Sequence, residues 1–204
     1  MAIAFQNKPE YAFGKIAETY IALWLRRRRG YSILPIYEKE IDDGKGPRFF
    51  TPNSELVAPD MLVMKGTDVR WIEAKHKDVF SWYWKGDYWV TGIDRHHYHQ
   101  YCKIADHYPW HVWLLFLHEN DRTLKRNEPW PCPTGLFGGT LPFLRRHTSH
   151  ESDRHGTSGM VYWAHNTLTQ LATLEEVKSA YHADPILKTG GRNGRQTKLD
   201  RGTE

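Results

Sequence analysis

Cysteine is scarce in this sequence and long apolar runs are missing, and these absences exclude two classes of protein. Two cysteines, Cys102 and Cys132, cannot form a disulfide framework, and neither belongs to a Cys-x-x-Cys pair. No stretch approaches the roughly eighteen consecutive apolar residues that a transmembrane helix needs. The first residues also lack the pattern of a secretory signal. We therefore expect a cytoplasmic protein without a membrane partner.

Net charge is only mildly positive, but the basic residues are clustered. Lysine and arginine number 28 against 24 acidic residues, so the formal net charge is +4 at pH 7. One cluster is Arg26 to Arg29, and a second basic segment runs from Lys188 to Arg201. The negative end of a helix dipole and phosphate binding explain the first cluster equally well. This charge is compatible with a polyanionic partner such as nucleic acid but does not require one.

The chain of 204 residues is long enough for one domain with a sizeable core. We assign residues 1–183 to this single domain. Residues 119–159 are rich in proline, glycine and charge, which predicts a surface insertion. Residues 184–204 are predicted to form a flexible basic tail.

Hydrophobic periodicity divides the domain into helices and strands. Helical spacing and capping signals predict helices at 11–29, 93–107 and 173–181. Short apolar segments predict strands at 31–37, 61–64, 69–75, 111–117 and 160–164, and an aromatic hairpin at 80–90. Residues 38–58 contain glycines and prolines and are expected to form a loop. Strands bracketed by helices predict an α/β fold with a central mixed sheet flanked by helices.

The predicted hairpin around residues 65–68 carries two acids and a lysine where apolar strands are expected. Asp60 opens the first strand, and Glu73 and Lys75 lie within the second. Side chains alternate across a strand, so Glu73 and Lys75 share one face. A carboxylate on an interior strand is costly unless it is compensated, and a divalent metal bridging Asp60 and Glu73 would compensate it. Turn chemistry at Asp60 and a plain Glu73–Lys75 salt bridge remain open as alternatives.

Glu18 adds a third carboxylate, on the helix predicted over 11–29. It adjoins an apolar stripe on that helix, so we expect it to border buried surface. The alternative is a surface glutamate that pairs with Lys15, three residues earlier. Together with the hairpin acids, Glu18 favours a metal site.

These residue types suit the hydrolysis of a phosphodiester. Carboxylate oxygens are ligands for Mg²⁺, with Mn²⁺ expected to substitute. A bound metal lowers the pKa of its water and neutralises charge on the phosphate. Lys75 is placed to orient or deprotonate that water, or to stabilise the developing negative charge.

Pro59-Asp60 and Glu73-Ala74-Lys75, preceded by Glu18 in an N-terminal helix, resemble the PD-(D/E)xK nuclease superfamily over roughly residues 11–118. The resemblance implies a restriction-endonuclease-like fold and Mg²⁺-dependent cleavage of DNA or RNA. It implies that Asp60, Glu73 and the backbone carbonyl of Ala74 bind the metal, and that Lys75 is catalytic. Small phage and mobile-element nucleases and archaeal Holliday-junction resolvases are similar in this respect. The Gln-x-x-x-Tyr motif of some exonuclease branches is missing, because Ile104 follows Gln100 by four residues.

Further residues are predicted to contact nucleic acid. Phosphate contacts are expected from the helix over 11–29, including its arginine cluster, and from the helix over 93–107. The residues expected to make them are Lys15, Arg26, Arg27, Arg95, His97 and Gln100. Trp82 and Trp84 are expected to stack on unpaired bases, although core packing or a dimer contact would explain them as well.

The sequence thus predicts a Mg²⁺-dependent deoxyribonuclease acting on duplex or branched DNA, with RNA as substrate and a homodimer left open. Two alternatives belong to other classes. One is an inactive nucleic-acid-binding module on the same fold, and the other is a structural or assembly protein. Neither needs Lys75 two residues after Glu73, so the acid-acid-lysine set weighs against both.

Overall fold

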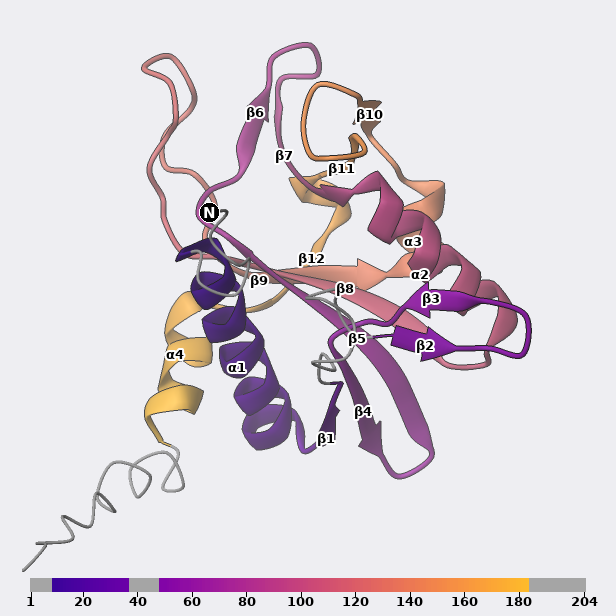
Figure 1. Ribbon diagram of the computed structural model, residues 1–204. Helices are drawn as coiled ribbons and strands as arrows, with labels where there is room; N and C mark the ends of the chain where they lie inside the picture. Colours follow the sequence, from indigo (N-terminus) through magenta and orange to yellow (C-terminus); the bar gives the residue numbers. More distant parts are fainter. Residues whose placement is uncertain (1–8, 37–47, 184–204) are drawn as a thin grey trace, which may run out of the picture.

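The computed structural model describes residues 9–36 and 48–183, with side chains from residue 14 onward. The tail predicted at 184–204 lies outside the described residues. Within them, one large sheet, one smaller sheet and a two-stranded ladder are packed together with four α-helices (Figure 1).

The large sheet has six strands in the order β1-β4-β5-β8-β9-β12. Their bounds are β1 (Ser32–Pro35), β4 (Met61–Lys65), β5 (Asp68–Lys77), β8 (His111–His118), β9 (Gly135–Thr140) and β12 (Thr169–Ala172). Strands β5 and β8 are parallel, and the other neighbours are antiparallel. The sheet is therefore mixed, and β5, its longest strand, runs through the middle of it.

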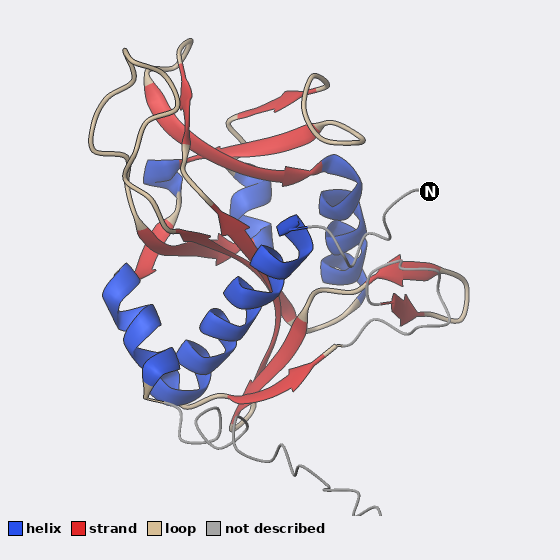
Figure 2. Ribbon diagram, turned by 60° about the vertical axis from the view of Figure 1, so that its left-hand side comes forward, coloured by secondary structure: helices blue, strands red, loops and turns tan. Residues whose placement is uncertain are grey.

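Helices cover both faces of this sheet (Figures 1 and 2). Helix α1 (Pro9–Arg29) packs with α4 (Leu174–His182) on one face, where Ile72 and Ala74 of β5 join its apolar cluster. Helices α2 (Arg95–His107) and α3 (Leu141–Arg146) lie on the other face, together with Trp71 of β5. The alternation of β5 side chains between two cores explains why this strand is apolar on both sides.

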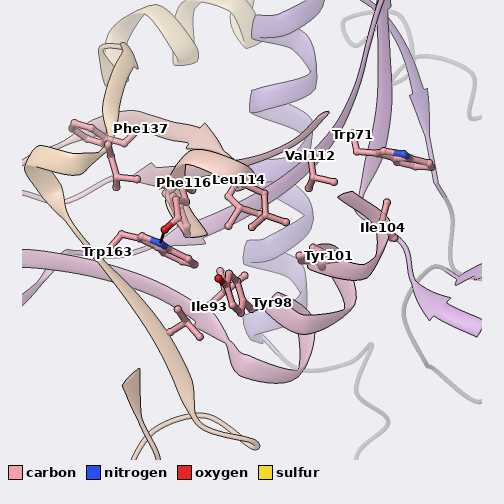
Figure 3. Packing of buried hydrophobic residues seen from close by; sticks show 14 of the residues in the cluster. Trp71, Ile93, Tyr98, Tyr101, Ile104, Val112, Leu114, Phe116, Phe137 and Trp163 are labelled. Carbon is pink, nitrogen blue, oxygen red and sulfur yellow. Dashed lines mark hydrogen bonds between the residues drawn. The ribbon is translucent and has the colours of Figure 1, made fainter. Parts of the chain in front are cut away.

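The smaller sheet has the order β10-β11-β7-β6 and lies beyond α2 and α3. Its strands are β6 (Ser81–Tyr83), β7 (Tyr88–Asp94), β10 (His150–Ser152) and β11 (Met160–Ala164), and a 3₁₀ turn, η3 (His165–Thr167), follows β11. Trp163 of β11 closes the core between this sheet and α2, and its indole nitrogen donates to the carbonyl of Leu144 at 2.9 Å (Figure 3). A buried indole N–H that has a partner avoids a desolvation penalty.

The predicted fold class is confirmed: the chain is an α/β protein with a central mixed sheet flanked by helices. The helix-hairpin-helix-strand order of α1, β4–β5, α2 and β8 is also the predicted one. The edge position of β1 agrees with Pro35, which cannot donate to a neighbouring strand. The capping box at Thr173 and Glu176 opens α4 as expected.

Two segments predicted to lack regular structure contain strands. Within 38–58, β2 (Arg48–Phe50) pairs with β3 (Glu55–Val57) as a short ladder; residues 38–47 lie outside the described part of the chain. The prediction of a surface insertion at 119–159 is wrong for the central part of this segment, because β9 is a buried strand of the central sheet. The strand over 160–164 exists but belongs to the smaller sheet.

No helix within the described ranges is long and apolar enough to cross a membrane.

Candidate active site

Glu73 and Lys75 lie two residues apart on one face of β5, as the alternation of a strand requires. The ammonium of Lys75 forms an ion pair with Oε1 of Glu73. The side chain of Glu73 is 1% exposed and that of Lys75 is 29% exposed, so the carboxylate is interior and the lysine side chain is partly accessible. The second oxygen of Glu73, Oε2, is buried and has no hydrogen-bond partner. An unsatisfied buried carboxylate oxygen is costly, so this atom marks a place where a cation would be stabilised.

Asp60 lies beside Glu73 because of the register of the hairpin. Met61 of β4 is opposite Ile72 of β5, which places the residue before Met61 next to the residue after Ile72. Oδ2 of Asp60 accepts a hydrogen bond from the backbone N–H of Ala74 at 2.8 Å. Burial and then the charge of Glu73 raise the pKa of Asp60 to about 7. Two carboxylates therefore meet in a space that disfavours two negative charges.

Glu18 approaches this pair from α1. Burial and then the charge of Asp60 raise the pKa of Glu18, while Lys15 and Lys75 lower it. Glu18 also accepts a hydrogen bond from the ammonium of Lys15 at 2.9 Å. Glu18 therefore pairs with Lys15 and also interacts with Asp60 of the hairpin.

The three carboxylates control the charge of Lys75. Burial by itself would lower the pKa of this lysine, but the charges of Glu73, Asp60 and Glu18 more than offset burial and raise it. Lys75 consequently stays protonated at neutral pH. Its positive charge compensates part of the negative charge that gathers here.

Helix α2 closes the other side of the site with His97 and Tyr101. Burial and the charge of Lys75 lower the pKa of His97 to about 4, so its imidazole is neutral at pH 7. Burial and the charges of Glu73 and Asp60 raise the pKa of the Tyr101 hydroxyl well above its usual value. Tyr101 was not among the predicted site residues. Its position four residues after His97, on the same helix face, is the signal that would have found it.

A cleft of about 680 Å³ opens beside the cluster. It is lined by residues from α1, from the end of β5 and from the segment after β8, namely Gly14, Glu18, Ala74, Lys75, His76, Asp78, Glu119, Asn120 and Arg122. The rim is polar and carries both signs of charge. A ligand in this cleft would contact Glu18 and Lys75 together.

The arginines predicted to contact phosphate lie away from this cleft. Arg26 and Arg27 are two turns or more beyond Glu18 on α1, and a guanidinium nitrogen of Arg27 donates to the carbonyl of Ala183, after α4. Arg95, at the start of α2, pairs with Glu151 at 3.0 Å and with Asp153 at 2.7 Å. These contacts hold α4 and the smaller sheet to the rest of the molecule.

The other predicted nucleic-acid contacts are divided between two places. Gln100 is on α2, one turn after His97, and its side-chain oxygen is buried without a hydrogen-bond partner. Trp82 packs edge-to-face on Trp89 with ring centroids 5.0 Å apart, and Trp84, 47% exposed, lies next to it. Both tryptophans line a separate hollow of about 750 Å³ on the smaller sheet.

The cluster of acids fits a divalent cation in two respects. Oε2 of Glu73 lacks a hydrogen-bond partner, and burial together with a neighbouring carboxylate raises the pKa values of Glu18 and Asp60. A cation would satisfy the oxygen and relieve the repulsion. Over residues 9–36 and 48–183, no three His, Cys, Asp or Glu side chains are already gathered as a ligand set. Mg²⁺ does not need such a set, because it commonly uses one or two carboxylates and keeps several waters.

Comparison with known proteins gives distant structural likenesses. No family model matches the chain, and no curated protein sequence matches it either. The structure of Hjc, a Holliday junction resolvase from Archaeoglobus fulgidus, has a TM-score of 0.43 and 8% identity over 76% of this chain and 90% of the resolvase. D212, a nuclease from a fusselovirus, has a TM-score of 0.36 and 12% identity over 85% of this chain and 91% of the D212 chain. At these scores the likeness carries no weight for function, which must come from the geometry of the site.

Proposed function

We propose that this protein is a metal-dependent nuclease that hydrolyses phosphodiester bonds of DNA. One observation carries the proposal: three acids from separate elements interact electrostatically with one protonated lysine, and the innermost acid keeps an unpartnered buried oxygen. A purely structural salt bridge would need one acid, not three. Sites that bring together groups with opposed pKa shifts in a cleft are candidates for catalysis.

Asp60, Glu73 and the backbone carbonyl of Ala74 are the proposed metal ligands, with Glu18 in support. Bound there, Mg²⁺ would supply charge neutralisation and a water molecule of lowered pKa. The raised pKa of Asp60 means that binding the ion also displaces a proton at and below neutral pH.

Lys75 is proposed to act as a fixed positive charge. Its pKa is raised, so at neutral pH it is a poor proton acceptor and a good stabiliser of the negative charge that develops on a phosphate. Its partly exposed side chain lines the cleft where a phosphate would lie. Among the roles predicted for Lys75, the raised pKa therefore favours electrostatic stabilisation over general base catalysis.

A cleavage assay tests the proposal. Labelled duplex, single-stranded, flap and four-way-junction DNA are incubated with Mg²⁺, Mn²⁺ or EDTA. The proteins are wild type, Lys75→Ala, Glu73→Gln and the control Lys125→Ala, which removes an equal charge from an exposed turn. We expect metal-dependent cutting by wild type and the control, and a loss of about a hundredfold or more in both site variants. Binding without cutting, unchanged by EDTA and by Lys75→Ala, would leave only the binding-module alternative.

A further inference from the structure

A second cavity, of about 350 Å³, lies on the α1 face of the central sheet. It is enclosed by the last turns of α1, by β4 and β5, and by residues of β8 and β12, namely Trp24, Leu25, Arg28, Arg29, Tyr31, Val63, Lys65, Arg70, Ile72, Trp113, Leu115 and Leu171. Arg29, on its rim, is about 16 Å along α1 from Glu18. This cavity is therefore distinct from the cleft beside Lys75, and it shares no lining residue with that cleft.

The rim of the cavity is cationic. Arg28, Arg29, Lys65 and Arg70 are among the lining residues, and none of the lining residues is acidic. The exposed ends of α1 and of the β4–β5 hairpin bring these four charges together, although they are far apart in sequence. The carboxylate of Asp68 offsets the charge of Arg70, which leaves Arg28, Arg29 and Lys65 to repel one another, so an anion placed among these three would be stabilised.

Neighbouring groups hold the cations in position. The ammonium of Lys65 donates to the carbonyl of Arg29 at 2.7 Å. The guanidinium of Arg70 binds both oxygens of Asp68, each at 2.7 Å. Arg28 donates to the hydroxyl of Ser179 at 3.1 Å. Side chains that are already oriented lose less entropy when they bind a ligand.

Aromatic rings and an apolar floor complete the cavity. The guanidinium of Arg70 lies 5.0 Å from the ring centroid of Trp113 and 5.8 Å from that of Tyr31. Beneath them, Val63, Ile72 and Leu115 are almost fully buried. Such a lining accepts a flat, largely apolar group, while the cationic rim accepts an anion. The volume is near the lower end of the range for small-molecule pockets, about 300–1,000 Å³, and excludes a duplex.

We propose that this cavity binds a single nucleotide unit. The phosphate would lie at Arg28, Arg29 and Lys65, and the base would lie against Tyr31 and Trp113. The nucleotide would be either a free nucleoside monophosphate or the terminal unit of a single strand. This inference does not depend on nuclease activity, since it concerns a different set of residues.

Binding is measured in EDTA, so that no cleavage takes place, by calorimetry and by quenching of tryptophan fluorescence. The probes are deoxyadenosine monophosphate, deoxyadenosine, inorganic phosphate and a short 5′-phosphorylated single strand. Because an effect of changing Arg70 or Trp113 could reflect altered packing, the variants are the exposed Arg28→Ala and Lys65→Met. The control is Lys125→Ala.

We expect the monophosphate to bind at least about tenfold more tightly than either the nucleoside or phosphate alone, because both halves of the cavity are used. Each rim variant should weaken it by about threefold to tenfold, and the control should not. A strand that competes with the monophosphate identifies a strand end as the natural occupant, and a strand that does not compete identifies the free nucleotide. No binding at millimolar monophosphate, binding unchanged by both rim variants, or binding lost in Lys75→Ala would overturn the proposal. A wild-type protein that binds the monophosphate but cuts no DNA in the presence of Mg²⁺ would instead overturn the proposed nuclease.

Discussion

At the scale of single residues, the ion pair between Glu73 and Lys75 determines how charge is compensated in the site. Glu73 is nearly inaccessible, and Lys75 is its only ionic partner among the described residues. Removing one member of a buried pair leaves the other charge uncompensated. This destabilises the protein more than replacing both members by apolar residues would. A bound cation could take over the compensation that the lysine provides.

This substitution of one positive charge for another gives the first prediction. Lys75→Met should lower the free energy of unfolding by about 2 kcal/mol in EDTA, less than for a fully buried pair because Lys75 is partly exposed. Saturating Mg²⁺ should stabilise this variant more than it stabilises the wild type. Urea titrations with and without Mg²⁺ measure both effects. Equal stabilisation of the two proteins by Mg²⁺ would show that the ion does not bind next to Glu73.

The raised pKa of Asp60 gives a pH-dependent prediction. Its pKa is about 7 in the folded protein against an ordinary value of 3.8, so the folded state keeps a proton that the unfolded chain releases between these values. The contribution of Asp60 to stability therefore falls as pH rises from about 4 to 7. His97 acts in the opposite direction, because its folded pKa of about 4 lies below the ordinary 6.5. A variant is needed to separate the two.

Asp60→Asn removes the pH-dependent contribution of Asp60 to stability and leaves that of His97. In EDTA, the wild type should lose stability relative to Asp60→Asn as pH rises from about 5 to 8. With Mg²⁺ present, the wild type should regain stability at the upper end of this range and the variant should not. Unfolding free energies at several pH values provide the measurement. Parallel pH profiles in EDTA would mean that Asp60 titrates normally.

At the scale of elements, β9 shows how a packing requirement can hide a strand. Gly135, Gly138 and Gly139 give this segment the composition of a loop, which is why it was predicted to be part of a surface insertion. In the structure β9 lies between β8 and β12 in the central sheet. A Cβ at Gly138 would come within 2.6 Å of the carbonyl oxygen of Leu114 and 2.5 Å of a methyl carbon of Leu115. Glycine is needed here for close approach between strands, not for a turn.

Two glycine substitutions should therefore have opposite effects. Gly138→Ala should destabilise the protein by about 2 kcal/mol, because the backbone carbonyl of Leu114 cannot move aside easily. Gly14→Ala, within α1, meets nothing within 4 Å and should stabilise the protein by up to about 1 kcal/mol through helix propensity. Thermal and chemical unfolding of both variants provide the comparison. A neutral Gly138→Ala would mean that β9 can shift away from β8.

The elements of the candidate site were easier to predict than β9 because their signals are local. Helical periodicity identified α1, and the polar turn between two apolar runs identified the β4–β5 hairpin. Alternation along β5 then placed Glu73 and Lys75 on one face. The approach of Glu18 to Asp60 had no local signal, since no local rule joins residues that far apart in sequence; it was expected because a metal site can use a third carboxylate and because of the resemblance.

At the scale of the whole molecule, salt dependence distinguishes the proposed function from an assembly role. A protein that binds nucleic acid through its phosphates releases counterions, so its affinity falls as salt increases. We expect the logarithm of affinity for labelled DNA in EDTA to fall with the logarithm of salt concentration with a slope of about −2 or steeper. Fluorescence anisotropy over a range of salt concentrations gives the slope. A flat profile, together with a stable protein complex, would favour the assembly protein.

The amino-acid sequence by itself determined the class of fold, the hairpin with its acids, and the identity of the candidate catalytic residues. These depend on periodicity, turn chemistry and residue type, all of which act over a few neighbouring positions. Only the tertiary structure decided which charged residues share a space. It brought Tyr101 to Glu73, turned Arg95 toward Glu151 and Asp153, and gathered four cations around a cavity far from Lys75. The physical reason is that electrostatic interaction depends on distance and burial, and both are set by packing between elements that the chain itself keeps far apart.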